Sequence, residues 1–391
     1  MKLVVIGLGQ CGGRIADEFS KLNKKAGRQR GIEIVTDTFA VNTDAADLEG
    51  LTSIKRDHQH RILIGGRKTG GHGVGKVNEL GAEVAKADAD KVIDAIRTTK
   101  RFYETDAFLL IASAGGGTGS GSLPVVTQHV KERYQDKPVL AAVVLPFEHE
   151  ETTEERTICN TATCLKSTYA MADTVILIDN QRYIRKDSSL RNNLQKINAL
   201  IAEPFYSILC AGEEKNAKNI GGKLLDAGDI MQTLVGWTVL GYGTTQLPLF
   251  RLPGKWGRDF KKKGDEVQNG LQAMDAAMSE LSLNCNPADA RRALYLISAP
   301  TKDINVNLVK ELGDYMRGIT PHAVIRNGDY PRQRGLLEVS VILSELSDVE
   351  KVREYYSQST VLIPEMKKRQ EETEDSLEEL EDASVSVPSL L

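Results

Sequence analysis

The stretch Ala114-Gly-Gly-Gly-Thr-Gly-Ser-Gly121 decides the fold of this chain. It follows the apolar run Ala107–Ala112 and precedes a helical pattern that starts near Leu123. Its glycines allow a tight turn and a close approach to a ligand, and consecutive N–H groups at the start of a helix bind anions. Thr118 and Ser120 can add hydroxyl donors. A flexible surface loop would not join a buried strand to a helix, so the stretch predicts a phosphate site. It lacks the Lys of a Walker A loop.

A second glycine turn, Gly7-Leu-Gly-Gln-Cys-Gly-Gly-Arg14, joins the apolar run Lys2–Ile6 to a helical pattern at Gly12–Leu22. It matches GxGxxG, the fingerprint of dinucleotide-binding domains. Taken alone, this turn supports an NAD-dependent oxidoreductase. An NAD site uses one glycine loop, however, and has no role for the loop at 115–121.

Two further loops follow apolar runs. Asn42-Thr-Asp-Ala-Ala-Asp47 offers carboxylates to a hydrated Mg²⁺, although a helix N-cap is the more common use of such residues. The loop Gly65–Gly81 is so rich in glycine that ordering it without a ligand would be costly. Its candidate contacts are Gly73, Gly75 and Lys76. Four loops at strand ends predict a triphosphate that is wrapped on several sides.

Short apolar runs alternate with helical patterns through the first half of the chain. The runs are Lys2–Ile6, Thr38–Val41, Arg61–Ile64, Ala107–Ala112, Pro138–Leu145 and Thr174–Ile178. Runs that are apolar at consecutive positions are typical of parallel strands buried on both faces. We therefore expect an α/β fold with a doubly wound parallel sheet, whose ligands bind beyond the carboxyl ends of the strands.

The second half of the chain has a different organisation. One long amphipathic helix is predicted over Ser188–Leu209, with a kink or restart at Pro204. A smaller α/β domain should follow, with helices at 230–240 and 266–282. Its apolar runs are Leu294–Ser298, His322–Ile325 and Leu336–Leu343. We expect a nucleotide domain at 1–186, the central helix at 187–212, a second domain at 213–364 and a flexible acidic tail at 365–391.

Composition limits the function classes. The chain has 391 residues, of which 41% are hydrophobic, 27% charged and 5% aromatic, with a net charge of −4. Eight of the acidic residues fall in Glu371–Asp382, so the body is near neutral and nucleic-acid binding is not expected. Five cysteines without CxxC spacing predict a reduced protein with no structural zinc site. No run is long enough to span a membrane, so we expect a cytoplasmic protein.

The motifs resemble those of one superfamily. The loop at 115–121 resembles the tubulin and FtsZ signature, and Gly9-Gln-Cys-Gly12 is similar to the first nucleotide loop of tubulins. Asn42-Thr-Asp-Ala45 resembles the second loop of FtsZ. Three later segments also match: Ile178-Asp-Asn180, the helix start at 194–198, and Leu225-Asp-Ala-Gly-Asp-Ile230. The mixture of tubulin-like and FtsZ-like loops is most similar to the archaeal CetZ family.

The resemblance implies a cytoskeletal protein that binds GTP or GDP with Mg²⁺, held mainly by phosphates and water rather than by a protein metal site. It also implies head-to-tail homopolymers, hydrolysis at the subunit interface, a role in cell shape, and an adaptor docking on the acidic tail. A polymer that binds nucleotide but hydrolyses it poorly is a further alternative. The implied nucleotide contacts are Gly9, Gln10, Cys11, Gly12, Gly13, Arg14, Asn42, Asp44, Gly73, Gly75, Lys76, Gly115, Gly116, Gly117, Thr118, Gly119, Ser120, Glu150, Arg156, Asn180, Leu194 and Asn198.

Catalysis is assigned by the same resemblance to Asp226 and Asp229 of the neighbouring subunit. Their i, i+3 spacing lets both side chains point one way, and a carboxylate can orient or deprotonate water. Helix capping is the alternative role for the pair. The family pattern is not complete, because Leu194 replaces the aromatic that stacks on the base and Leu224 replaces an Asn. The ribose-binding acid is expected at Glu150, with Glu151 as the alternative.

Overall fold

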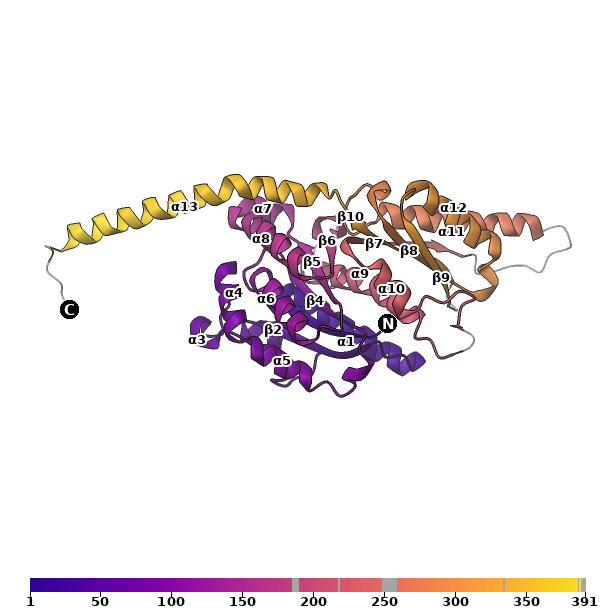
Figure 1. Ribbon diagram of the computed structural model, residues 1–391, viewed down its shortest axis with the longest axis horizontal. Coiled ribbons are helices and arrows are strands. Elements are labelled where there is room, and N and C mark those ends of the chain that lie inside the picture. The colour runs from indigo at the N-terminus through magenta and orange to yellow at the C-terminus, as the bar shows by residue number, and fades with distance from the viewer. Residues whose placement is uncertain (185–189, 217–218, 248–258, 333–334, 386, 388–391) are drawn as a thin grey trace.

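A single ten-stranded sheet organises the molecule (Figure 1). The computed structural model describes residues 1–184, 190–216, 219–247, 259–332, 335–385 and 387; the side chains of 190–194, 259–265, 370, 374, 378 and 381 are not described. The strand order is β3-β2-β1-β4-β5-β6-β7-β10-β8-β9. No helix of the described residues is long and apolar enough to cross a membrane.

Six parallel strands form the first part of the sheet, as predicted. They are β1 (Leu3–Leu8), β2 (Val35–Asn42), β3 (Arg61–Leu63), β4 (Ala107–Ser113), β5 (Val139–Leu145) and β6 (Thr174–Asp179). Every residue of β1, β5 and β6 is buried, because helices cover both faces. Leu8 pairs with Val41 and Ala112, and Leu145 with Asp179. The carboxyl ends of these strands therefore meet at one edge, here called the carboxyl edge.

Two apolar cores lie on opposite faces of the sheet. One contains buried residues of α4 (Asn78–Ala87), α5 (Ala89–Arg97), α6 (Thr118–Arg133) and α8 (Glu155–Met171). The other contains those of α1 (Gly9–Arg30) and α9 (Leu190–Ala211). Short helices complete this part of the chain: α2 (Ala45–Glu49), α3 (Gly66–Thr69), α7 (Glu148–Thr153), η1 (Phe102–Glu104) and η2 (Asn180–Tyr183). The doubly wound arrangement is thus confirmed.

The same sheet continues into the second half of the chain. β7 (Gly236–Gln246) pairs in parallel with β6, and β10 (Leu336–Leu346) runs antiparallel to both β7 and β8 (Arg292–Ala299). β9 (Val324–Pro331) is the far edge strand, parallel to β8. The covering helices are α11 (Asp259–Ser279) and α12 (Val306–Ile319), with η4 (Pro287–Asp289) and η5 (Thr301–Asp303) between them. One sheet therefore crosses the expected boundary at 187–212, and the division into domains stays a prediction.

The helix predicted at 230–240 is wrong over most of its length. α10 (Ala227–Thr233) ends after seven residues, and β7 begins at Gly236. Gly236 has a φ of +59°, which turns the chain away from a helical path. The apolar run that follows pairs with β6 and β10, so the need to complete the sheet overrides the helical pattern.

α9 connects the two edges of the sheet. Its 22 residues span about 33 Å at 1.5 Å per residue. Near its end, the Leu209 carbonyl accepts a hydrogen bond of 3.1 Å from the amino group of Met1, which lies just before β1. The helix therefore runs from the carboxyl edge back to the opposite, amino edge. It does not restart at Pro204, contrary to one of the two expectations.

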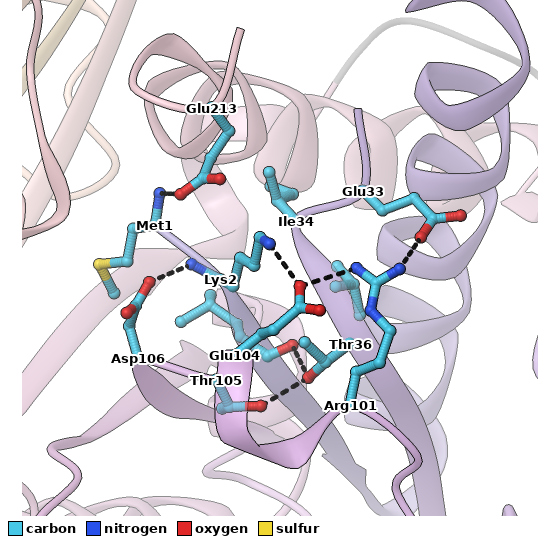
Figure 2. A network of polar contacts seen from close by, with 12 residues as sticks. Met1, Lys2, Glu33, Ile34, Thr36, Arg101, Glu104, Thr105, Asp106 and Glu213 are labelled. Atoms are coloured by element: carbon cyan, nitrogen blue, oxygen red, sulfur yellow. Dashed lines mark hydrogen bonds and ion pairs between the residues drawn. The ribbon is translucent and has the colours of Figure 1, made fainter. Parts of the chain in front are cut away.

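Polar contacts join the elements at the amino edge (Figure 2). The Met1 amino group donates to Glu213 Oε1 at 2.9 Å, just beyond α9. Lys2 Nζ pairs with Glu104 at 2.5 Å, and Arg101 bridges Glu104 and Glu33 at 2.9 Å each. The first contact holds the end of α9 beside the start of β1, and the other pairs join the start of β1 to η1 and to the segment before β2.

The acidic end of the chain is helical rather than irregular. α13 (Glu350–Ser384) has 35 residues, packs on α8 and then projects beyond the body (Figure 1). Arg369 pairs with Glu155 of α8 at 3.0 Å and with Glu365 at 3.5 Å. Glu, Lys, Arg and Leu are strong helix formers, and such i, i+4 pairs add to their preference. The flexible tail expected at 365–391 is therefore replaced by helix as far as Ser384.

Candidate functional site

Two helix N-termini meet at the carboxyl edge. β1 enters α1 through Gly9, whose φ is +69°, and a Cβ on Gly9 would lie 3.0 Å from the Gly119 nitrogen at the start of α6. Neither helix has a capping side chain or an acidic residue in its first turn. Among the helices of eight or more residues whose N-caps are described, α1 and α6 alone share both features. Their first N–H groups therefore favour an anion.

The glycines of the α6 loop permit close packing on one side and leave space on the other. A Cβ on Gly117 would lie 2.6 Å from Val74 Cγ2, and one on Gly121 would lie 2.1 Å from the Asn78 carbonyl oxygen. A Cβ on Gly116 would meet no atom within 4 Å. We call residues 7–13 and 115–120 together the phosphate cradle.

The loop after β2 lies against this cradle. The hydroxyls of Thr43 and Thr118 are 2.6 Å apart. Asp47 accepts hydrogen bonds from Gln10 Nε2 at 2.5 Å and from Asn42 Nδ2 at 3.1 Å. Asp44 caps α2 by accepting from the Asp47 amide at 3.0 Å. The capping role considered for this loop is thus present. No group of three or more His, Cys, Asp or Glu residues in the described ranges could hold a metal ion.

The loop at 65–81 also packs beside the cradle. The Gly73 amide donates to the Thr43 carbonyl at 3.1 Å. Both Gly73 and Gly75 have positive φ, and a Cβ on either would meet nothing within 4 Å. Lys76 has a φ of +62° and pairs through Nζ with Glu154 at 2.7 Å. Arg156 pairs with Glu79 at 2.6 Å and so ties α8 to α4.

Asn160 on α8 is a residue that no sequence motif indicated. Its side chain is buried, and its Nδ2 lies 2.9 Å from the Lys76 carbonyl and 3.3 Å from the carbonyls of both Gly115 and Gly116. One amide group therefore joins the loop at 65–81 to the cradle. It orients the backbone of the cradle without reaching the phosphate space itself.

Replacing Asn160 with Ala should loosen both loops. The change leaves buried carbonyls without a donor, which costs about 1–3 kcal/mol of stability. We expect a lower unfolding temperature and about tenfold weaker binding of a nucleotide at the cradle. Thermal unfolding and nucleotide titration would measure the two effects. Ala at the exposed Asn286, which caps only η4, is the matched control, and equal behaviour of the two variants would contradict the assignment.

Glu150 lies toward the start of α1. The pKa of the Cys11 thiol is raised to about 12, mainly by burial and also by the negative charge of Glu150, against a smaller opposite effect of Arg14. Glu150 also accepts a hydrogen bond of 2.9 Å from the Phe147 amide. Glu151 instead accepts a hydrogen bond from Tyr355 of α13. The charge of Glu150 thus reaches the start of α1, whereas Glu151 is bonded by α13, and the choice between the two as the ribose-binding acid stays a prediction. Cys11 stays a neutral thiol at neutral pH.

Two Asn side chains lie beyond β6. Asn180 is buried at the start of η2, and η2 packs against α9, which carries the half-buried Asn198. Within the described part of the chain, neither side-chain amide makes a hydrogen bond, so both can bond a ligand. Leu194 lies in the first turns of α9, but its side chain is outside the described residues.

Asp226 and Asp229 lie at the opposite, amino edge. A Cβ on Gly212, just after α9, would lie 2.3 Å from the carbonyl oxygen of Leu225. Asp226 caps α10 by accepting from the Asp229 amide at 2.7 Å, which is the alternative role considered for it. Asp229 pairs with Arg326 of β9 at 3.1 Å. The structure thus brings the loops at 7–13, 42–47, 65–81 and 115–120 together at the carboxyl edge, while Asp226 and Asp229 follow the other end of α9.

The comparisons with known proteins agree with this architecture. Residues 2–186 match the GTPase domain of the tubulin/FtsZ family, and residues 187–360 match the C-terminal domain of tubulin-like CetZ. The chain is 32% identical to CetZ1 of Haloferax volcanii over 369 residues, 90% of each chain. It is 30% identical to CetZ3 of the same organism over 97% of each chain.

Solved structures give the same result. A GDP-bound monomer of CetZ1 from Haloferax volcanii superposes with a TM-score of 0.78 at 29% identity, covering 93% of this chain and 99% of the other. A GTPγS-bound protofilament of CetZ2 from that organism superposes with a TM-score of 0.77 at 28% identity. The match covers 94% of this chain and 100% of the other. The turn at Gly7–Gly12 is therefore part of a tubulin/FtsZ-type domain rather than of a dehydrogenase. The chain belongs to the tubulin-like CetZ family of cytoskeletal GTPase-domain proteins.

Proposed function

We propose that this protein binds GTP at the carboxyl edge, assembles head to tail, and hydrolyses GTP only where two subunits meet. The observation that supports this most is the separation of the two halves of the site. α9 is about 33 Å long and leads from the carboxyl edge to the amino edge, where the segment with Asp226 and Asp229 packs against its end. The acids cannot reach the cradle of their own subunit, but those of a subunit stacked on the carboxyl edge can. Such a contact joins unlike surfaces and generates open filaments.

The phosphate cradle supplies binding and charge stabilisation. The first N–H groups of α1 and α6 would face the phosphate oxygens, with Thr118 as a hydroxyl donor. The GDP-bound and GTPγS-bound states of the two related CetZ structures support this ligand class. Mg²⁺ fits the site as an ion bound mainly through phosphates and water, with Asp44 able to hold one water, and it would supply positive charge there.

The neighbouring subunit supplies the group that handles water. Phosphoryl transfer depends on a positioned nucleophile and on charge stabilisation rather than on covalent chemistry by the protein. Asp229 can accept a proton from the attacking water or hold that water in line. Asp226 keeps α10 capped and so fixes the position of Asp229 in the turn. A subunit without a neighbour lacks this step, which makes turnover dependent on assembly.

Asn180 and Asn198 are proposed to recognise the guanine base of the nucleotide. An amide can donate to the guanine O6 and accept from its N–H groups. Glu150 is proposed to bind the ribose hydroxyls, since it lies toward the start of α1. The aliphatic Leu194 replaces an aromatic at the position implied to stack on the base, so selectivity rests mainly on the two amides.

Replacing Asn198 with Ala should weaken GTP binding about tenfold, because one or two hydrogen bonds of about 1 kcal/mol are lost. Binding of ATP, which cannot form those bonds, should change little. Titration with both nucleotides measures the ratio of the affinity for GTP to the affinity for ATP. Ala at the exposed Glu203 on the same helix is the control. An unchanged GTP-to-ATP ratio would show that Asn198 does not read the base.

Sedimentation tests the proposal as a whole. GTP should move the protein into the pellet at micromolar concentration, GDP should not, and pelleted material should contain filaments by electron microscopy. The GTPγS-bound protofilament of CetZ2 supports this expectation. Equal sedimentation with GTP, GDP and no nucleotide would contradict it.

The cellular role proposed here, control of cell shape, rests on the resemblance to CetZ, and so does the proposal that an adaptor docks on the acidic part of α13. Loss of the gene should alter cell outline while division sites keep their position. If cell outlines stayed unaltered while division failed, the proposed role in cell shape would be contradicted.

A further inference from the structure

Arg326 holds the proposed catalytic acid through a single contact. Its Nε lies 3.1 Å from Asp229 Oδ1, and both side chains are partly exposed, at 23% and 39%. Within the described residues, the second oxygen of Asp229 makes no hydrogen bond or ion pair. One oxygen of the carboxylate is therefore fixed to β9, while the other stays free.

The local sequence would otherwise direct Asp229 elsewhere. Asp226 is the N-cap of α10 and Asp229 lies three residues later, which is the spacing of a capping box. In a complete box, the N-cap side chain accepts from the third residue, and that residue's carboxylate accepts from the N-cap amide. Only the first bond is present here, at 2.7 Å. The Asp229 carboxylate bonds Arg326 instead of folding back to its own helix.

Arg326 is itself anchored on both sides. Its Nη2 donates to the side chain of Gln232, and Arg292 of β8 donates to the Gln232 carbonyl. Arg292 also pairs with Glu345 of β10 at 2.7 Å. Glu345 lies where the register of β10 against β7 shifts, and its φ is +55°. These contacts fix the guanidinium of Arg326 relative to three strands and to α10.

We propose that Arg326 is a positioning residue, which keeps the Asp229 carboxylate out of the capping box so that its free oxygen can reach water at the neighbour's nucleotide. The proposal rests on the role given above to Asp229. A half-exposed ion pair contributes at most about 1 kcal/mol to stability, so the pair is poorly explained by stability alone. Its effect on the orientation of a reacting group can be much larger.

Replacing Arg326 with Ala should let Asp229 close the capping box. We expect about tenfold slower GTP turnover per assembled subunit, a value within the range for a misplaced catalytic group. The critical concentration for assembly and the affinity for GTP should stay within twofold of the unaltered protein. Arg326→Lys should recover most of the turnover, since an ammonium group can still attract the carboxylate. Ala at Arg317, whose partner is Asp314 on α12, is the matched control.

A double variant separates positioning from a direct role. If Arg326 acts only through Asp229, then Asp229→Ala with Arg326→Ala should turn over GTP no more slowly than Asp229→Ala alone. A further fall of tenfold in the double variant would show that Arg326 touches the reacting phosphate itself and would overturn the proposal.

Other outcomes distinguish this inference from the function on which it rests. Normal turnover of Arg326→Ala in assembled filaments would remove the inference and leave the shared site intact. Loss of assembly in both Arg326→Ala and Arg326→Lys would mark the residue as an assembly contact and would also overturn the inference. Turnover by unassembled, unaltered protein at the filament rate would remove the shared site and the role of Arg326 with it.

Discussion

Asp229→Ala is expected to assemble with GTP and to hydrolyse it about 10²-fold to 10³-fold more slowly than the unaltered protein. The physical reason is that the carboxylate is the group proposed to orient or deprotonate the attacking water, and such groups contribute about 10²-fold to 10⁴-fold. The side chain is partly exposed and its one ion pair is with Arg326. Its removal should therefore change stability little.

Phosphate release, normalised to the sedimented protein, measures this effect. Asp229→Asn is a useful companion, because it keeps the shape of the side chain and a possible hydrogen bond while removing the charge. Asp226 is a poorer choice, since it caps α10 and its loss costs about 1 kcal/mol in addition to any catalytic effect. Turnover of Asp229→Ala within threefold of normal in equal amounts of filament would remove Asp229 from the mechanism.

Gly116→Val is expected to abolish GTP binding at concentrations that saturate the unaltered protein. A Cβ at Gly116 meets no protein atom within 4 Å, so the fold can accept the side chain. The proposed phosphate position lies over this same loop, so the added side chain would compete for that space. Overlap with a phosphate group costs about 3 kcal/mol or more, which corresponds to about 10²-fold in affinity.

Nucleotide titration and thermal unfolding should be measured together on this variant. Gly318→Val is the matched control, because a Cβ there also meets nothing within 4 Å and α12 is far from the cradle in the fold (Figure 1). Weak GTP binding with an unchanged unfolding temperature is the expected pair of results. Normal affinity in Gly116→Val would place the phosphates somewhere other than this loop.

Much of the first half of the fold could be predicted because its pattern is local. Strands buried on both faces, such as Val139–Leu145, are apolar at every position. The loops that follow them must then meet at one edge, since the carboxyl ends of parallel strands lie together. That residues 7–13, 42–47 and 115–120 lie at one edge thus followed from the predicted parallel arrangement of the strands.

The second half depended on contacts that a local pattern does not contain. The segment 236–240 was predicted to be helical, but it forms a strand because it pairs with β6, which is distant in sequence. The part of α13 from residue 365 onward was expected to be mobile because it has few apolar residues. It is instead supported by helix propensity and by residues some 200 positions earlier, such as Glu155 and Cys159. Amino-acid composition alone cannot predict such contacts between distant residues.

Within the site, single polar residues were the hardest to predict. Asn160 lies more than 40 positions from the loop whose carbonyls it bonds, and Arg326 lies 97 positions from Asp229. Neither sits in a motif, because each acts from a regular helix or strand on a loop that it meets only after folding. The position of Asp226 and Asp229 near the far end of α9, in contrast, agrees with their place in the sequence after the long helix predicted over Ser188–Leu209.

The shared site is the central claim, and the concentration dependence of GTP turnover tests it most directly. Phosphate release with GTP and Mg²⁺ would be measured across protein concentrations, with light scattering recorded in parallel. The account predicts that activity per molecule is near zero below a critical concentration, rises steeply above it, and follows the scattering. Activity per molecule that is flat across the same range would mean that each subunit hydrolyses GTP alone, and would contradict the account.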